Sequence, residues 1–125
     1  MTPKIQTQPV KSDSKDVVLN FINALNNEDF ETARNCLDPA MVFDDTCNHI
    51  RGVEDYIRDL KKLKFKYKIK KMIEDGDYVC LIYDINMAGK NVFTCGCYQL
   101  KNGKINLIKV IFDPSSAPFK NIGSV

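Results

Sequence analysis

The spacing of apolar residues changes once along this chain, and that change constrains the fold more than any other feature. Up to about residue 60, apolar residues recur every three or four positions, which is typical of amphipathic helices. From Leu63 to Phe112 apolar and polar residues alternate, which is typical of strands with one buried face. Helices followed by strands favour an α+β domain.

Turn and cap residues give the predicted elements their bounds. The first helix is predicted to begin near Ser12–Ser14, and Asp29 is a good N-cap for a second, short helix that Pro39 stops. A short strand at Ala40–Phe43 follows, and then Gly52 leads into a third helix. The long strands are predicted at Leu63–Ile73, Tyr78–Met87, Val92–Leu100 and Ile105–Phe112, and an Asn-Gly hairpin turn joins the last two.

The length of 125 residues and the hydrophobic content of 44% fit one compact domain. Residues 1–12 are polar and aperiodic, and we predict a flexible N-terminal arm before a single domain of residues 13–125. We interpret the five cysteines as reduced thiols of a cytoplasmic protein, because their spacing suggests no disulfide framework. No apolar run reaches membrane-spanning length, and no membrane partner is expected.

Residues 61–71 carry seven lysines and no acid. The lysines alternate with Phe65, Tyr67 and Ile69, so these apolar side chains face the core and cannot stack on bases. With a net charge of only +2, the pattern favours a solvated strand face, and no nucleic-acid partner is predicted.

Cys47, His49, Cys95 and Cys97 supply the ligand count of a structural zinc site. The single residue between Cys95 and Cys97 leaves no turn to wrap a metal ion, so we predict neither a metal nor another cofactor. Cysteines that act as small apolar residues in a dimer interface are the simpler interpretation.

Two segments and one glycine carry a resemblance to a known family. The segment "FINALNNEDFETARNCLDPAMVFDD", Gly52 opening a helix, and "GKINLIKVIFDP" resemble the nuclear-transport-factor-2-like superfamily, especially its SnoaL-like, ketosteroid-isomerase-related branch. The resemblance covers about residues 14–114. It implies a cone of three N-terminal helices on a curved, mostly antiparallel sheet, with a pocket between them and a homodimer through the outer sheet face. Members include isomerases, cyclases, dehydratases, epoxide hydrolases and non-catalytic domains, so the fold leaves function open.

The resemblance also implies site residues. Asp44 matches the catalytic base of ketosteroid isomerase, whereas Phe21 and Gly96 take the positions of its two oxyanion donors, so steroid isomerisation is not expected. Adjacent strand residues face opposite sides, and only one of Asp44 and Asp45 can enter the cavity. A carboxylate in an apolar cavity is poorly solvated, which suits it to proton transfer.

The remaining candidates follow from the same alignment. Tyr98 shares the inward parity of Gly96 and is the predicted hydroxyl donor. His49 is expected in the loop that surrounds the mouth of the cone in this family. Asp84 and Lys109 are further polar candidates, and the sequence does not decide whether their side chains face the cavity or the solvent. The apolar walls are predicted to be Phe21, Tyr56 and Phe112.

Two functions remain open at this point. The first is the binding of a small hydrophobic molecule in the cone, with isomerase-, cyclase- or dehydratase-type proton transfer if the protein is an enzyme. The alternative is a non-catalytic dimer that binds a partner or sequesters a ligand. An open cavity with Asp44 at its floor favours the first, and a filled cavity with Phe21 and Tyr98 in contact favours the second.

Overall fold

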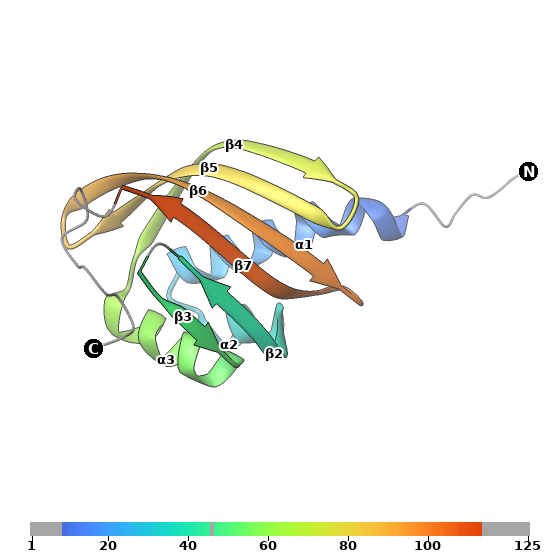
Figure 1. Ribbon diagram of the computed structural model, residues 1–125, viewed down its shortest axis with the longest axis horizontal. Helices are drawn as coiled ribbons and strands as arrows, with labels where there is room; N and C mark the ends of the chain where they lie inside the picture. Colours follow the sequence, from blue (N-terminus) through green and yellow to red (C-terminus); the bar gives the residue numbers. More distant parts are fainter. Residues whose placement is uncertain (1–8, 46, 114–125) are drawn as a thin grey trace, which may run out of the picture.

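The computed structural model of the chain describes residues 9–45 and 47–113, with side chains from Ser14 onward. Three helices precede or interrupt the strands, and six strands form one sheet (Figure 1). The helices are α1 (Pro9–Asn26), α2 (Phe30–Asn35) and α3 (Val53–Leu63). The strands are β2 (Leu37–Asp44), β3 (His49–Arg51), β4 (Lys66–Asp75), β5 (Tyr78–Met87), β6 (Lys90–Lys101) and β7 (Lys104–Phe112).

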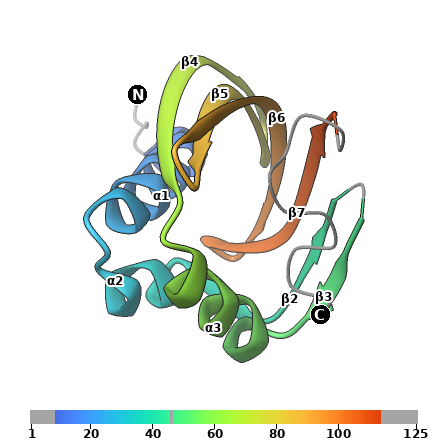
Figure 2. The same ribbon diagram turned by 90° about the vertical axis from the view of Figure 1, so that its left-hand side faces the viewer.

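The sheet has the strand order β3-β2-β7-β6-β5-β4, and only the β2–β7 pair is parallel. It curves strongly, and the three helices cover its concave side (Figure 2). One register shift lies between Ile69 and Lys71 in β4, and another lies in β7, where Ile105 pairs with Leu100 and Leu107 with Gln99. Such bulges bend a strand and increase its twist, which accounts for the curvature. The predicted α+β class, with helices on a curved and mostly antiparallel sheet, is confirmed.

The region of α2 differs from the prediction at its end. Asp29 is the N-cap as predicted, because its side chain accepts a hydrogen bond of 3.2 Å from the Thr32 amide. The helix ends at Asn35 rather than near Pro39, and Leu37 already belongs to β2. Pairing with β7 overrides the helical pattern here, since the Ile105 amide donates to the Cys36 carbonyl at 2.9 Å.

Two further bounds differ from the predictions. Helix α1 begins at Pro9 instead of near Ser12, so the end of the predicted arm is helical, and residues 1–8 lie outside the described residues. Strand β3 stands where a loop was predicted, and it pairs antiparallel with β2, His49 opposite Asp44. A strand of three residues is too short to show an alternating pattern, and its pairing partner alone defines it.

Alternation sorts the side chains of the long strands onto two faces. On β6, Val92, Thr94, Gly96 and Tyr98 are buried on the concave face, whereas Phe93 is 67% exposed on the outer face. On β5 the residues Tyr83, Ile85 and Met87 are buried. The concave face, together with the apolar sides of α1 and α3, forms the core.

Candidate functional site

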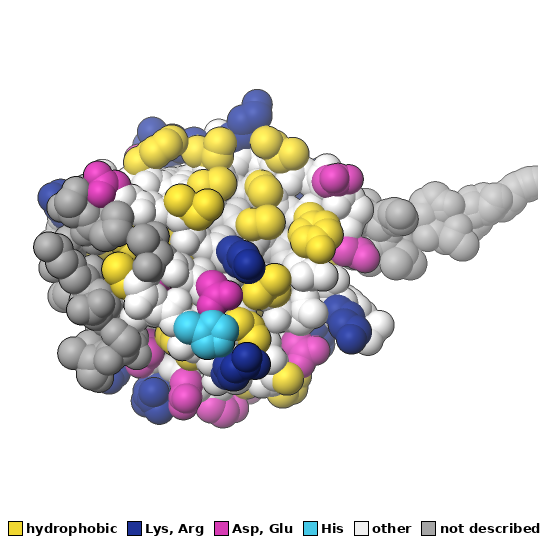
Figure 3. Space-filling model, viewed as in Figure 1, with side chains coloured by type: hydrophobic (Ala, Val, Ile, Leu, Met, Phe, Trp, Pro, Cys, Tyr) yellow, Lys and Arg dark blue, Asp and Glu magenta, His cyan; other side chains and the backbone are white. Residues whose placement is uncertain are grey.

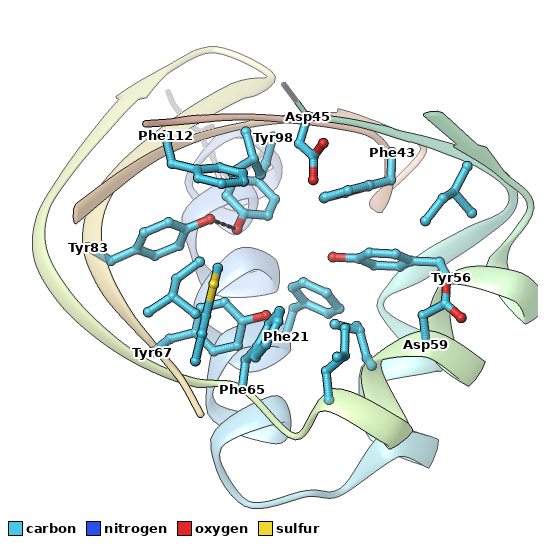
Figure 4. Close-up of a pocket in the computed structure, with 16 residues that line it drawn as sticks. Phe21, Phe43, Asp45, Tyr56, Asp59, Phe65, Tyr67, Tyr83, Tyr98 and Phe112 are labelled. Atoms are coloured by element: carbon cyan, nitrogen blue, oxygen red, sulfur yellow. Dashed lines mark hydrogen bonds between the residues drawn. The ribbon is translucent and has the colours of Figure 1, made fainter. Parts of the chain in front are cut away.

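A cavity of about 50 Å³ lies between the concave face of the sheet and the helices α1 and α3 (Figure 4). At roughly 10–15 Å³ for each water it has room for about four waters. Sixteen residues line it, and eight of them are aromatic. The lining consists of Phe21, Phe43, Asp45, Ile50, Tyr56, Asp59, Leu60, Leu63, Phe65, Tyr67, Tyr83, Ile85, Met87, Tyr98, Val110 and Phe112.

Asp45 is the carboxylate that points into the cavity (Figure 4). Its Oδ1 accepts hydrogen bonds from the backbone amides of Cys47 at 2.7 Å and Asn48 at 2.6 Å. The Asn48 side-chain amide lies 3.2 Å from each carboxylate oxygen. This turn holds the Asp45 side chain in one orientation, and Oδ2 accepts fewer hydrogen bonds than Oδ1.

Asp44 faces away from the cavity and does not line it. Phe43 and Asp45 both line the cavity, and alternation along the strand turns Asp44 to the other side. There its carboxylate is hydrogen-bonded to Nδ1 of His49, its partner across the β2–β3 ladder. The carboxylate of the cavity is therefore Asp45, the neighbour of the residue that the family alignment indicates.

Four tyrosine hydroxyls surround the cavity. The hydroxyls of Tyr83 and Tyr98 are hydrogen-bonded to each other at 2.7 Å. Burial raises the pKa of Tyr67 and Tyr83, and it raises the pKa of Tyr56 and Tyr98 well above the ordinary value of a phenol. All four side chains therefore stay neutral at physiological pH, where they can donate hydrogen bonds but cannot act as bases.

Gly96 makes room for the hydroxyl pair. A Cβ at this position would collide with the Tyr83 hydroxyl and would lie 3.0 Å from Tyr83 Cζ and 3.1 Å from Tyr98 Cε1. The space that a side chain at position 96 would occupy is thus filled by the end of Tyr83, which arrives from the neighbouring strand β5.

Asp59 of α3 joins the cavity to a surface groove of about 320 Å³ lined by His49, Ile50, Arg51, Asp55, Arg58 and Asp59. The Asp59 residue is 8% exposed, and its Oδ1 lies 3.7 Å from Nε of Arg58. Its Oδ2 has no hydrogen-bond partner among the described residues. The groove contains both signs of charge, whereas the described residues that line the cavity include no lysine, arginine or histidine.

The SnoaL-like domain model matches residues 18–108, which is most of the chain. The chain belongs to the SnoaL-like domain family. No curated protein matches this SnoaL-like chain. It is similar to an NTF2-like protein of unknown function from Cytophaga hutchinsonii, with 43% identity, a TM-score of 0.81 and coverage of 92% of this chain and 96% of that one.

Other solved structures share the fold of this SnoaL-like domain. An LEH-like epoxide hydrolase from M. tuberculosis is 26% identical, with a TM-score of 0.76 and coverage of 86% of this chain and 88% of that one. A Kribbella flavida protein provisionally assigned as a ketosteroid isomerase is 12% identical, with a TM-score of 0.77 and coverage of 87% and 84%. At 12% identity the similarity shows the fold alone.

The other predicted site residues of this SnoaL-like domain separate into two groups. Phe21, Tyr56, Tyr98 and Phe112 line the cavity. Asp84 and Lys109 do not: Asp84 lies 3.3 Å from Lys70 in an ion pair between β5 and β4, and Lys109 is exposed on β7.

Sequence reasoning missed Asp45 and Tyr83. The signal for Asp45 was the strand parity that it shares with Phe43. The signal for Tyr83 was the polar pair Asp84 and Asn86, which marks the opposite face of β5 as the solvated one. Among residues 9–45 and 47–113, no group of three or more His, Cys, Asp or Glu side chains is placed to hold a metal ion.

Proposed function

We propose that this SnoaL-like protein binds a small, largely apolar molecule in the aromatic cavity. The observation that carries the proposal is the lining itself: apart from Asp45 and Asp59 it consists of aromatic and aliphatic side chains. A concave apolar site with a few convergent polar groups is the usual form of a small-molecule site. Phe21 and Tyr98 make an edge contact with ring centroids 6.3 Å apart, yet the cavity of about 50 Å³ remains beside them.

We further propose proton-transfer chemistry without a cofactor, of the isomerase, cyclase or dehydratase type, with Asp45 as the base. Its carboxylate points at the cavity. Tyr83 and Tyr98 share one hydrogen bond, so one hydroxyl of that pair, together with the Tyr56 hydroxyl, is a neutral hydrogen-bond donor for a ligand oxygen that gains charge. The same pairing of a carboxylate with a neutral donor suits the opening of an epoxide by water. The similarity to an epoxide hydrolase therefore supports including epoxides among the candidate substrates.

The test compares two adjacent carboxylates. Wild type, Asp45→Asn and Asp44→Asn are assayed against a panel of small apolar epoxides, hydroxy ketones and β,γ-unsaturated ketones. Any turnover should fall by about 10²–10⁴-fold in Asp45→Asn, which removes the base, and should persist in Asp44→Asn. Loss of turnover in Asp44→Asn alone would return the catalytic role to Asp44, and loss in neither variant would remove both carboxylates from the mechanism.

The second candidate is a non-catalytic dimer, and the outer face of the sheet supports the dimeric state. Hydrophobic side chains gather over β4–β7 in the view of Figure 3. Four large hydrophobic side chains of this sheet are about half exposed or more: Ile73, Tyr78, Phe93 and Ile111. Exposed apolar side chains gathered on one face are typical of a protein–protein interface. We propose that two copies pack through this face.

Sedimentation velocity over a range of protein concentrations tests the dimer. Wild type should sediment as a dimer, and Phe93→Lys or Ile111→Lys should sediment as a monomer because a lysine would be buried without a partner in the interface. Lys62→Glu, an exposed change on α3, is the control. A monomeric wild type at all concentrations would contradict the proposal.

We also propose a cytoplasmic location. All five cysteines of the sequence are free, and three of them, Cys80, Cys95 and Cys97, lie partly exposed on the outer face of β5 and β6. Free thiols in such number support a reducing compartment. No helix among the described residues is both long and apolar enough to span a membrane.

A further inference from the structure

We propose that the molecule bound in the cavity is a small organic cation with an alkylated ammonium group. This inference rests on the proposed binding function and specifies its ligand class. It follows from three properties of the lining taken together: its aromatic side chains, a carboxylate with no ion pair among the described residues, and the volume of the cavity.

Aromatic side chains form half of the lining, and two of them stack on Tyr56. Its ring stacks on Phe43 with centroids 4.9 Å apart and on Phe21 with centroids 6.5 Å apart. The Tyr56 hydroxyl points into the cavity (Figure 4). Ring faces and phenol oxygens both carry negative partial charge, and several of them around one space attract a cation.

Asp45 supplies a full negative charge at the same place. Within the described part of the chain, the Asp45 carboxylate accepts hydrogen bonds only from N–H groups of Cys47 and Asn48, and it forms no ion pair. The neighbouring acids differ, because Asp44 pairs with His49 and Asp59 lies near Arg58. A carboxylate beside an apolar cavity is most stable when a cation compensates it, and an anionic ligand would be repelled.

The volume fits one head group. About 50 Å³ holds roughly four water-sized atoms, which is the heavy-atom count of a trimethylammonium group. Bulky methyl groups on nitrogen would contact the rings and bury apolar surface, and they would still present positive charge to Asp45. The remainder of the ligand would extend towards Asp59 and the polar groove, which the cavity adjoins.

An isosteric pair of probes isolates the charge. Choline and 3,3-dimethylbutan-1-ol have the same shape, but only choline carries a positive nitrogen. Each is titrated into the ¹⁵N-labelled full chain, and the dissociation constant is taken from the amide shifts of Gly96 and of residues near Tyr56. We expect choline to bind at least tenfold more tightly than the neutral alcohol.

Variants assign the preference to its source. Asp45→Asn keeps the acceptor oxygen that the turn amides need, so the turn is preserved while the charge is lost. We expect this change to reduce choline affinity about tenfold and to alter the affinity of the alcohol by less than twofold. Asp84→Asn, on the outer face, is the matched control and should leave both affinities unchanged.

The outcomes separate the two proposals. A choline preference that disappears in Asp45→Asn and persists in Asp84→Asn supports the inference. Equal binding, or tighter binding of the alcohol, overturns the cation while the apolar binding site stands. Binding of neither probe at any accessible concentration overturns the cation and counts against the binding site as well. A preference that Asp45→Asn leaves intact removes Asp45 from ligand recognition.

Discussion

The two faces of the central strands carry nearly opposite surfaces, although they alternate residue by residue along the same backbone. The concave face of β5 and β6 presents buried rings and hydroxyls such as Tyr83 and Tyr98. The outer face of the same strands presents thiols, the Asp84–Lys70 pair and the exposed ring of Phe93.

The difference shows that a cavity residue is identified by its parity more than by its chemical type. Asp44 and Asp45 are identical side chains at adjacent positions, yet one pairs with His49 on the outer face and the other points at the cavity. The same holds for phenylalanine, since Phe21 is fully buried and Phe93 is 67% exposed. Substitutions that are matched in chemistry and opposed in face therefore test the comparison directly.

The largest expected effect comes from the two phenylalanines. Phe21→Ala should lower the free energy of unfolding by about 3–5 kcal/mol, because it leaves a hole beside Tyr56 and Tyr98. Phe93→Ala should change it by less than about 0.5 kcal/mol in the monomer. Urea unfolding followed by circular dichroism measures both values. A cost for Phe93→Ala that grows with protein concentration would show that the outer face is covered by a second copy.

A smaller effect is expected at Gly96. Gly96→Ala should cost about 1–3 kcal/mol, because the new methyl group overlaps the Tyr83 hydroxyl in a packed interior. In a Tyr83→Phe background the same change should cost less, since the overlapping oxygen is gone, and a double-mutant cycle gives the difference. Cys95→Ala, an outward-facing change on the same strand, is the control. Equal costs in both backgrounds would mean that Tyr83 moves aside freely.

The smallest effect concerns alkaline pH. Burial raises the pKa of Tyr67 in the folded protein, so its contribution to stability is complete below the unfolded value of about 10 and is lost as pH rises beyond it. Each such tyrosine should add about 1.4 kcal/mol per pH unit to the loss of stability above pH 10. Tyr67→Phe should therefore reduce the slope of unfolding free energy against pH between 9 and 11. An unchanged slope would indicate that the Tyr67 hydroxyl is hydrated in the native state and has the same pKa as in the unfolded chain.

Much of the fold was predictable because it depends on local patterns. The alternation from residue 63 to 112 gave the four long strands to within a few residues at each end, and Asp29 gave the start of α2. The bounds that failed depend on partners distant in sequence. Leu37 is a strand residue because Ile105 lies opposite, and β3 exists because the chain after Asp45 folds back on β2.

The candidate site was only partly predictable for the same reason. Tyr98 and Gly96 share a face by simple alternation, and that much is written in the sequence. The collision that Gly96 avoids involves Tyr83, thirteen positions earlier and on the other side of a hairpin, and its hydroxyl bond to Tyr98 appears only when β5 and β6 are in register.

The sequence by itself determined the order of helices and strands, the division of each long strand into a solvent-exposed and a buried face, and the family to which the chain belongs. Tertiary structure decided which acid meets the cavity, how much space remains inside and which hydroxyls meet there. The physical reason is range: hydrophobic periodicity acts between near neighbours in the chain, whereas a cavity is the space left by side chains from α1, α3 and the curved sheet, which only folding brings together.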